Sequence, residues 1–254
     1  MIFDGHSDIF SDVRYKREAG ETQVLKNHHL DRLRKGGIGG ACFVIWADTY
    51  NGHAPKDEME AIVKGIKGEM AETKEFVLIH NVEELKAAEA AGKFAILLGI
   101  EGLAGIGEDL SKIDELYDLG ARHAMLTWNE ENALATGVKG DPNRGVTELG
   151  KQAIKKLQEK KMILDVSHIN EKSFWDVIDL ATGPILASHS NAKALASAAR
   201  NLTDDQLRAI RDTNGLVGLN AFGDFISDNK AEQDVDHLVN HATYIADKIG
   251  VEHL

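Results

Sequence analysis

The chain has 254 residues, 43% of them hydrophobic, and a formal net charge of −12 at pH 7. It lacks the excess of lysine and arginine with which proteins neutralise phosphates, so nucleic-acid binding is not expected. No apolar run reaches the roughly 18 residues of a membrane-spanning helix, and the first residues lack the pattern of a signal peptide, so a membrane location is not expected.

The only cysteine, Cys42, lies in the apolar run ACFVIWA and is expected to be a small buried side chain. A single cysteine excludes an internal disulfide and suits a reducing compartment. We therefore expect a cytoplasmic protein.

Short apolar runs alternate with helical patterns along the chain. Strands are expected at residues 2–8, 39–47, 94–102, 121–128, 162–168, 184–190 and 215–222. One of the helices between them is expected to begin with an Asn81 cap, and another with a capping box of Thr203 and Gln206. The last helix is long and is expected to end at Gly250. Alternation of this kind indicates parallel βαβ units.

The strand number, the continuous apolar runs and the chain length favour a (β/α)8 TIM-type barrel over an open doubly wound sheet. Residues 1–254 are expected to form a single metal-dependent hydrolase barrel domain. The last predicted helix is followed by the residues GVEHL, which read as the beginning of a further strand. We therefore expect the last strand and helix of the barrel to be missing from this chain and to follow Leu254 in the gene product.

Side chains of the kind that bind metals occupy the predicted carboxyl ends of four strands. His6 and Asp8 are two residues apart, so they project to the same side of the first strand. Glu101, His168 and His189 end three later strands. Each of them alone is more simply a hydrogen-bonded polar residue at a strand end. In a barrel, however, these ends meet at one face, so we expect the five side chains to converge.

This ligand set contains three imidazoles, two carboxylates and no thiolate, a mixture that suits zinc and also manganese or iron. Five protein ligands exceed the three of a single catalytic zinc, but they fit two ions if one carboxylate bridges them. Two such ions, about 3.5–4 Å apart, generate a bridging hydroxide near neutral pH and polarise a carbonyl. The set therefore predicts hydrolysis of an unreactive amide.

Several motifs, in the same order along the whole chain, resemble the membrane (renal) dipeptidase family of zinc peptidases. They are DGHSD at the start, GIEG around Glu101, LDVSH at His168, and ASHSNA and ARNLTDD within residues 187–205. The resemblance implies a (β/α)8 barrel with two Zn²⁺ ions per chain and a small dipeptide as substrate. A homodimer is left open.

Carried over position by position, the resemblance implies that His6 and Asp8 bind the first zinc. It implies that His168 and His189 bind the second zinc. Glu101 matches the carboxylate that bridges the two ions, and it is the residue that we assign to the catalytic centre.

Arg200, in ARNLTDD, matches the family arginine that pairs with the terminal carboxylate of the substrate, a task that suits a guanidinium fork. Two departures from the family pattern stand out. Trp128, in LTWN, occupies a substrate-binding position where the family often has a histidine, so either another group makes that contact or the substrate range differs. The chain also has no counterpart of the family's Gly-Ser-Asp-Phe-Asp-Gly strand, whose first aspartate shuttles protons and holds the substrate's amino group.

Two other functions stay open. The first is an amidohydrolase acting on a cyclic amide, a lactone or a nucleobase; such sites usually have His-x-His on the first strand and often a modified lysine on the fourth, and neither occurs here. The second is a truncated barrel that binds metal without turnover. A metal-dependent dipeptidase is the leading prediction.

Other histidines are expected to be structural or solvated. His28 and His29 are expected on a helix surface, and His123 near the start of a strand. His237 and His241 have the i, i+4 spacing of metal ligands, but no H-E-x-x-H pattern accompanies them, so a solvated helix face is expected there.

Overall fold

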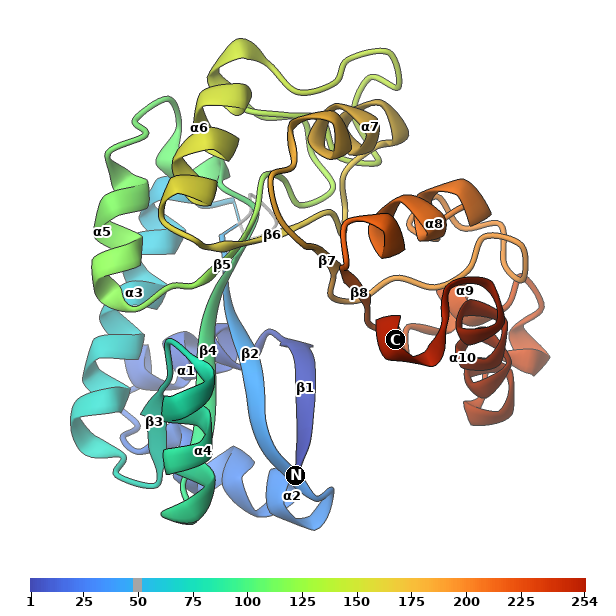
Figure 1. Cartoon of the computed structure of the whole chain (residues 1–254). Coiled ribbons are helices and arrows are strands. Elements are labelled where there is room, and N and C mark those ends of the chain that lie inside the picture. Colours follow the sequence, from blue (N-terminus) through green and yellow to red (C-terminus); the bar gives the residue numbers. More distant parts are fainter. Residues whose placement is uncertain (48–51) are drawn as a thin grey trace. The chain divides into compact units, whose positions relative to one another are not determined.

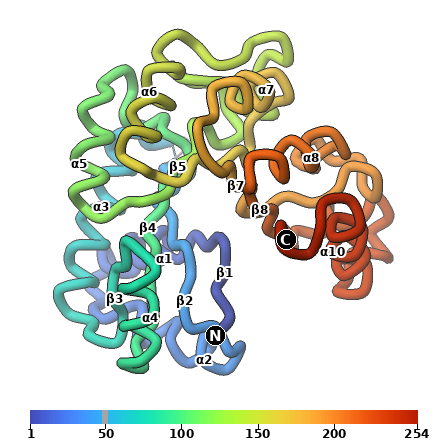
Figure 2. The backbone as a smooth tube through the Cα atoms, in the orientation of Figure 1, coloured from blue at the N-terminus to red at the C-terminus, as the bar shows by residue number. Residues whose placement is uncertain are grey.

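The computed structural model describes residues 1–47 and 52–254. The chain divides into two units, Met1–Ala124 and Met125–Leu254 (Figures 1 and 2).

Unit 1 is built on a four-stranded parallel sheet with the order β1-β2-β4-β3 (Figure 1). Its strands are β1 (Ile2–Ser7), β2 (Ile38–Trp46), β3 (Phe76–Leu78) and β4 (Phe94–Glu101). Strands β2 and β4 pair in continuous register, from Gly40 opposite Ala95 to Trp46 opposite Glu101. The sequences of both strands are nearly continuous apolar runs, because both strands lie in the interior of a parallel sheet.

The helices of unit 1 follow the strands in alternation. They are α1 (Ile9–Glu18), α2 (Asp31–Lys35), α3 (Pro55–Glu72), α4 (Val82–Ala90) and α5 (Lys112–Leu119), with a π-helical turn at Leu25–Leu30 and a 3-10 turn at Ala104–Ile106. Helix α1 packs on α3, and the Arg14 guanidinium lies 3.2 Å from the Glu58 carboxylate in that interface. The predicted cap of α4 is confirmed, since the Asn81 side chain accepts a hydrogen bond from the Glu84 amide.

Unit 2 contains the second sheet, with the order β5-β6-β7-β8. Its strands are β5 (His123–Met125), which holds the boundary between the units, β6 (Ile163–Asp165), β7 (Ile185–Ala187) and β8 (Leu216–Val217). Its helices are α6 (Glu148–Glu159), α7 (Glu171–Leu180), α8 (Asp204–Asp212), α9 (Gly223–Ile226) and α10 (Val235–Ile249), with 3-10 turns at Lys230–Glu232 and Val251–His253. The predicted capping box of Thr203 and Gln206 is confirmed at the start of α8.

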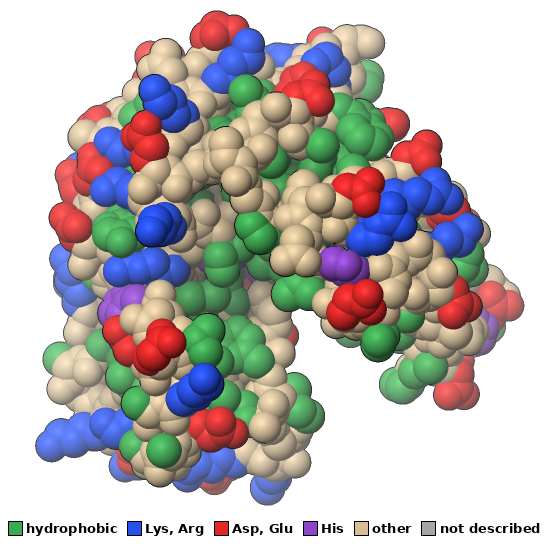
Figure 3. Space-filling model, in the orientation of Figure 1, with side chains coloured by type: hydrophobic (Ala, Val, Ile, Leu, Met, Phe, Trp, Pro, Cys, Tyr) green, Lys and Arg blue, Asp and Glu red, His purple; other side chains and the backbone are tan. Residues whose placement is uncertain are grey.

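Exposed helix faces carry pairs of opposite charge at helical spacing, such as Lys151 with Glu148 and Lys172 with Asp176. Figure 3 shows acidic and basic side chains interspersed over the face that it draws. Exposed pairs of this kind contribute little to stability, about 0–1 kcal/mol each.

The parallel α/β fold is confirmed, and each of the seven predicted strand regions contains a strand. Strand β3 was not predicted. A closed barrel is not confirmed, because the strands of residues 1–47 and 52–254 form two four-stranded sheets and no closed one. Within the same residues, no helix is both long enough and apolar enough to cross a membrane.

The expected strand start after Gly250 is wrong, because residues Val251–His253 form a 3-10 turn. Gly250 ends α10 with φ of 93°, in a region that favours glycine. The His253 amide then bonds the Gly250 carbonyl, and the His253 ring bonds the Gly215 carbonyl at 2.8 Å. These two bonds turn the backbone away from an extended path.

Two histidines are less exposed than expected. His241 is fully buried, so the solvated face is wrong for this residue, whereas His237 is partly exposed and bonds Asp234. His29 is also buried, and its Nε2 lies 2.8 Å from the carboxylate of Asp12 in α1. Cys42 is buried, as expected.

Candidate metal centre and substrate arginine

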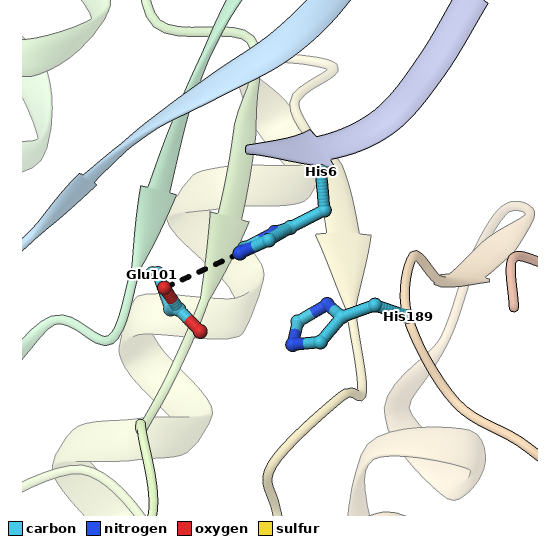
Figure 4. A group of neighbouring side chains, drawn as sticks. All are labelled: His6, Glu101 and His189. Carbon is cyan, nitrogen blue, oxygen red and sulfur yellow. Dashed lines mark ion pairs between the residues drawn. The ribbon is translucent and has the colours of Figure 1, made fainter. Parts of the chain in front are cut away.

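The first cluster of ligand-type side chains lies in unit 1, at the carboxyl ends of β1 and β4. These strands flank β2 and run parallel, so their carboxyl ends share one edge of the sheet. His6 Nε2 lies 3.3 Å from Glu101 Oε2 and 3.7 Å from Asp8 Oδ1. Figure 4 draws the ion pair of His6 and Glu101 as a dashed line. The structure thus brings together the three site residues predicted for this half of the chain.

Charge governs this cluster. Burial raises the pKa of Glu101 to about 7, because its side chain is only 4% exposed and the charge of Asp8 adds to the effect. Burial by itself would lower the pKa of His6, but hydrogen bonds and charges from Asp8 and Glu101 outweigh it and raise that pKa to about 11. Burial would raise the pKa of Asp8, yet the bond and charge of His6 lower it. Without a metal, His6 therefore carries a proton between two carboxylates.

This cluster fits a divalent cation. The two carboxylates that lie beside His6 and raise its pKa also favour a cation at this place, and loss of the His6 proton makes Nε2 available as a ligand. One nitrogen and carboxylate oxygens form a donor set that zinc accepts.

The second cluster lies in unit 2, after the neighbouring parallel strands β6 and β7. His168 Nε2 and His189 Nε2 face each other at 2.7 Å. On the far side of each ring, His168 Nδ1 lies 2.9 Å from Asn129 Oδ1, and His189 Nδ1 lies 2.9 Å from Ser188 Oγ. Figure 4 draws the His189 side chain, which follows the last residue of β7, Ala187, by two positions. Both rings are therefore held by Nδ1 and present Nε2.

The hydrogen bonds limit the tautomers of this pair. Asn129 Oδ1 can only accept, so His168 donates from Nδ1. One of the two Nε2 atoms donates to the other, and the Ser188 hydroxyl can either donate to His189 Nδ1 or accept from it. With both Nε2 atoms deprotonated, the pair can offer two imidazole nitrogens to a metal.

The spacing of the pair also bears on metal binding. Two nitrogens bound to one tetrahedral zinc at about 2.0–2.1 Å lie about 3.3 Å apart. The Nε2 atoms of His168 and His189 are 2.7 Å apart, so the rings would have to separate by roughly 0.6 Å to bind one such ion together. His168 has φ of 73°, a left-handed conformation that is unusual for a non-glycine residue. Strained backbone of this kind is often found at functional sites.

Arg200 and Trp128 belong to the same unit as the histidine pair. Arg200 is buried, and its Nη2 donates to the His189 carbonyl at 3.2 Å. The Trp128 ring lies 6.0 Å from the His168 ring, and Lys139 Nζ lies 5.6 Å from the centre of the Trp128 ring. The predicted site residues therefore occupy two clusters: His6, Asp8 and Glu101 in unit 1, and His168, His189, Arg200 and Trp128 in unit 2.

Three supporting residues were not assigned from the sequence. Asn129 and Ser188 hold the two rings, and the buried Asp165 holds the strand ends that carry them. The Asp165 carboxylate accepts from the Ser167 amide at 2.8 Å and from the Ser188 amide at 3.3 Å. An aspartate inside the apolar strand of LDVSH was the one visible signal, since a buried carboxylate needs donors.

Comparison with known proteins identifies the family. Residues 1–254 match the family described as membrane dipeptidase (peptidase family M19). The chain belongs to this family. It is therefore a metallopeptidase of the dipeptidase type, a hydrolase that acts on peptide bonds.

Relatives of this dipeptidase span nearly its whole length. A protein of Acinetobacter calcoaceticus, named for the PQQ-III 3′ region, is 30% identical over 283 residues, which cover 98% of this chain and 90% of the relative. A dipeptidase of Schizosaccharomyces pombe is 28% identical over 279 residues, which cover 100% of this chain and 67% of the relative.

Solved structures resemble this dipeptidase in fold as well. A metallopeptidase of Rhodobacter sphaeroides, crystallised with a phosphinate mimic of the dipeptide L-Ala-D-Ala, superposes with a TM-score of 0.87 at 25% identity. The match covers 98% of this chain and 82% of that one.

Proposed function

We propose that this dipeptidase hydrolyses the amide bond of small dipeptides with two zinc ions per chain. The observation that carries the proposal is that each ligand-type side chain at a family motif lies beside another: His6 beside Glu101 and Asp8, and His168 beside His189. The proposal includes a (β/α)8 barrel formed by the whole chain as one domain, in the cytoplasm. Support for the barrel is that each cluster follows the carboxyl ends of parallel strands.

In this proposal His6 and Asp8 hold the first ion, His168 and His189 hold the second, and Glu101 bridges them. When bound, such a pair of ions supplies a hydroxide at neutral pH and polarises the amide carbonyl. The contribution of the protein is to keep the ligand side chains deprotonated and correctly oriented. Asn129 and Ser188 serve the orientation by occupying Nδ1 of each second-ion histidine.

Arg200 binds the terminal carboxylate of the dipeptide. Its guanidinium is buried beside His189, and a buried guanidinium fork suits a carboxylate because it can donate two parallel hydrogen bonds. Trp128 supplies an apolar wall next to His168, where the family often has a histidine. This wall favours uncharged substrate side chains at that position.

Hydrolysis of a dipeptide panel by the full chain tests the proposal, before and after chelation and with zinc restored. The first substrate to try is L-Ala-D-Ala, because a mimic of it is bound to the Rhodobacter sphaeroides relative. We expect hydrolysis of free dipeptides, weak hydrolysis of C-terminally amidated ones, loss of activity on chelation and recovery with zinc. Preferred turnover of lactones or cyclic amides would instead support the amidohydrolase alternative.

A further inference from the structure

His241 is a fully buried histidine of α10 whose two ring nitrogens both bond backbone atoms. The Ala192 amide donates to Nδ1 at 3.1 Å, and Nε2 lies 2.8 Å from the Ile226 carbonyl oxygen. An amide N–H can only donate and a carbonyl can only accept, so His241 accepts at Nδ1 and donates from Nε2. The ring therefore links two separate backbone segments.

The two segments joined by His241 are those that surround Arg200. Ala192 lies in the segment between β7 and α8, which carries Arg200 near its end. Ile226 is the last residue of α9, and its neighbour Phe225 has its ring centre 5.7 Å from the Arg200 guanidinium carbon. Through α9, His241 thus supports the aromatic surface beside the arginine.

Further hydrogen bonds tie the same two segments together. The Phe225 carbonyl accepts from the side-chain amides of Asn191 at 3.1 Å and of Asn201 at 2.9 Å. Asn191 precedes the His241 contact at Ala192, and Asn201 follows Arg200 directly. The arginine therefore projects from a loop that is held to α9 on both sides.

Helix α10 is itself bonded to α8, so His241 can hold the Ala192 and Ile226 segments in fixed positions. Tyr244 Oη and Lys248 Nζ bond the carboxylate of Asp204, the first residue of α8, at 2.8 and 2.6 Å. The i, i+4 spacing of His237 and His241 does not reflect a metal site, because both ring nitrogens of His241 are engaged by backbone atoms and the His237 ring bonds Asp234.

We propose that His241 is a positioning residue for Arg200, and that it sets the affinity for the substrate's terminal carboxylate without touching the substrate. The inference rests on the proposed function, which assigns that carboxylate to Arg200. A guanidinium fork binds a carboxylate through two directional bonds, so a small displacement of its loop weakens the contact. Binding of the scissile amide depends on other groups and changes little.

Two substitutions separate the two bonds of His241. His241→Gln retains a donor that can reach the Ile226 carbonyl but loses the acceptor for Ala192. His241→Asn retains an acceptor near the Nδ1 position but loses the donor for Ile226. His237→Gln, one turn earlier on the same helix and partly exposed, is the matched control.

The first measurement is steady-state hydrolysis of a free dipeptide and its amide by the zinc-supplied full chain. For His241→Gln we expect KM for the free dipeptide to rise about tenfold, the effect of one weakened charge-assisted contact, with kcat within about twofold of wild type. The preference for the free over the amidated dipeptide should shrink by a similar factor. His241→Asn should lie between this variant and wild type, and His237→Gln should match wild type.

The second measurement is hydrogen–deuterium exchange without substrate, which does not depend on turnover. His241→Gln should speed exchange around Ala192, and His237→Gln should not. If His241→Gln fails to fold, Phe225→Leu tests the same idea, because it removes the aromatic surface beside Arg200 and keeps the backbone acceptors. We expect this variant to raise KM for free dipeptides without a loss of thermal stability.

Unchanged KM and unchanged exchange in folded His241→Gln would overturn the inference, as would equal losses of kcat for free and amidated substrates. If Arg200→Ala raises KM while those results hold, the proposed function stands and only the role of His241 falls. Wild-type enzyme that ignores the substrate's terminal carboxylate would instead refute the assignment of Arg200, and the exchange result would then report a purely structural link.

Discussion

The two ligand clusters differ in how they are prepared for a metal. In the His6 cluster a protonated imidazole lies between two carboxylates, and the buried Glu101 has a pKa of about 7. In the His168–His189 cluster the two rings face each other through Nε2, and each Nδ1 is already engaged by Asn129 or Ser188. Charged neighbours determine metal binding in the first cluster, whereas fixed ring orientation determines it in the second. We therefore expect metal affinity to depend on charge and pH in the first cluster, and on the groups that hold the rings in the second.

The largest effect is expected from Glu101→Gln. The substitution removes the charge that the proposed bridge shares between both ions, so both should bind more weakly and kcat should fall by more than about 100-fold. Metal content by elemental analysis and kcat should fall together. Glu108→Gln, an exposed glutamate in the loop that follows β4, is the control and should change neither. Full metal content and full rate in Glu101→Gln would disprove the bridge.

Arg200→Ala should follow in size. Loss of the guanidinium removes the partner of the substrate's carboxylate, so kcat/KM for free dipeptides should fall about 10–100-fold, mainly through KM. Amidated dipeptides should lose much less. Bound metal should stay at the wild-type level, because Arg200 is not a ligand. An equal loss on free and amidated dipeptides would refute this role.

Asn129→Ala tests the importance of orientation in the second cluster. The His168 ring would lose its Nδ1 partner, so affinity for the second ion should fall about 10–100-fold, while the first ion binds as before. Titration with zinc followed by calorimetry can resolve the two steps. Asn143→Ala, in the exposed part of the same loop, should leave both steps unchanged. Equal weakening of both ions would show that the clusters do not differ in this way.

The smallest expected effect is the release of protons when the metal ions bind. This effect should also distinguish the two clusters most clearly. His6 has a pKa raised to about 11, so at pH 8 it must lose its proton when a metal binds, and affinity for the first ion should rise with pH. The second ion binds between two imidazoles that are already oriented through Nδ1, so we expect its affinity to depend less on pH. Calorimetry in buffers of different ionisation enthalpy measures both steps. A pH-independent first step would contradict this account of His6.

Local features of the fold were predictable, because short-range sequence signals determine them. The seven strand regions follow from apolar runs, and the caps at Asn81 and Thr203 follow from polar residues before helical patterns. Strand β3 was missed because it has only three residues, Phe76–Leu78, too few to show a pattern. The 3-10 turn at Val251–His253 depends on a distant contact of His253 with the Gly215 carbonyl, which no local signal reveals.

Candidate site residues were recognisable as chemical types at strand ends, whereas the groups that hold them were not. Asn129 meets His168 from 39 residues away, and only the folded chain shows this. His241 could have been recognised as buried, because it shares one face of α10 with Ile245 and Ile249, at i+4 and i+8. The i, i+4 spacing of His237 and His241 was a weaker signal, because it takes no account of the apolar residues Ile245 and Ile249 on the same helix face.

The central claim is that the two clusters hold two ions in one centre bridged by Glu101. Anomalous diffraction at the zinc absorption edge from crystals of the zinc-loaded chain tests it most directly. We predict two peaks about 3.5–4 Å apart, one ligated by His6 and Asp8, the other by His168 and His189, with Glu101 touching both. A single peak, or two peaks without a shared Glu101, would contradict the account.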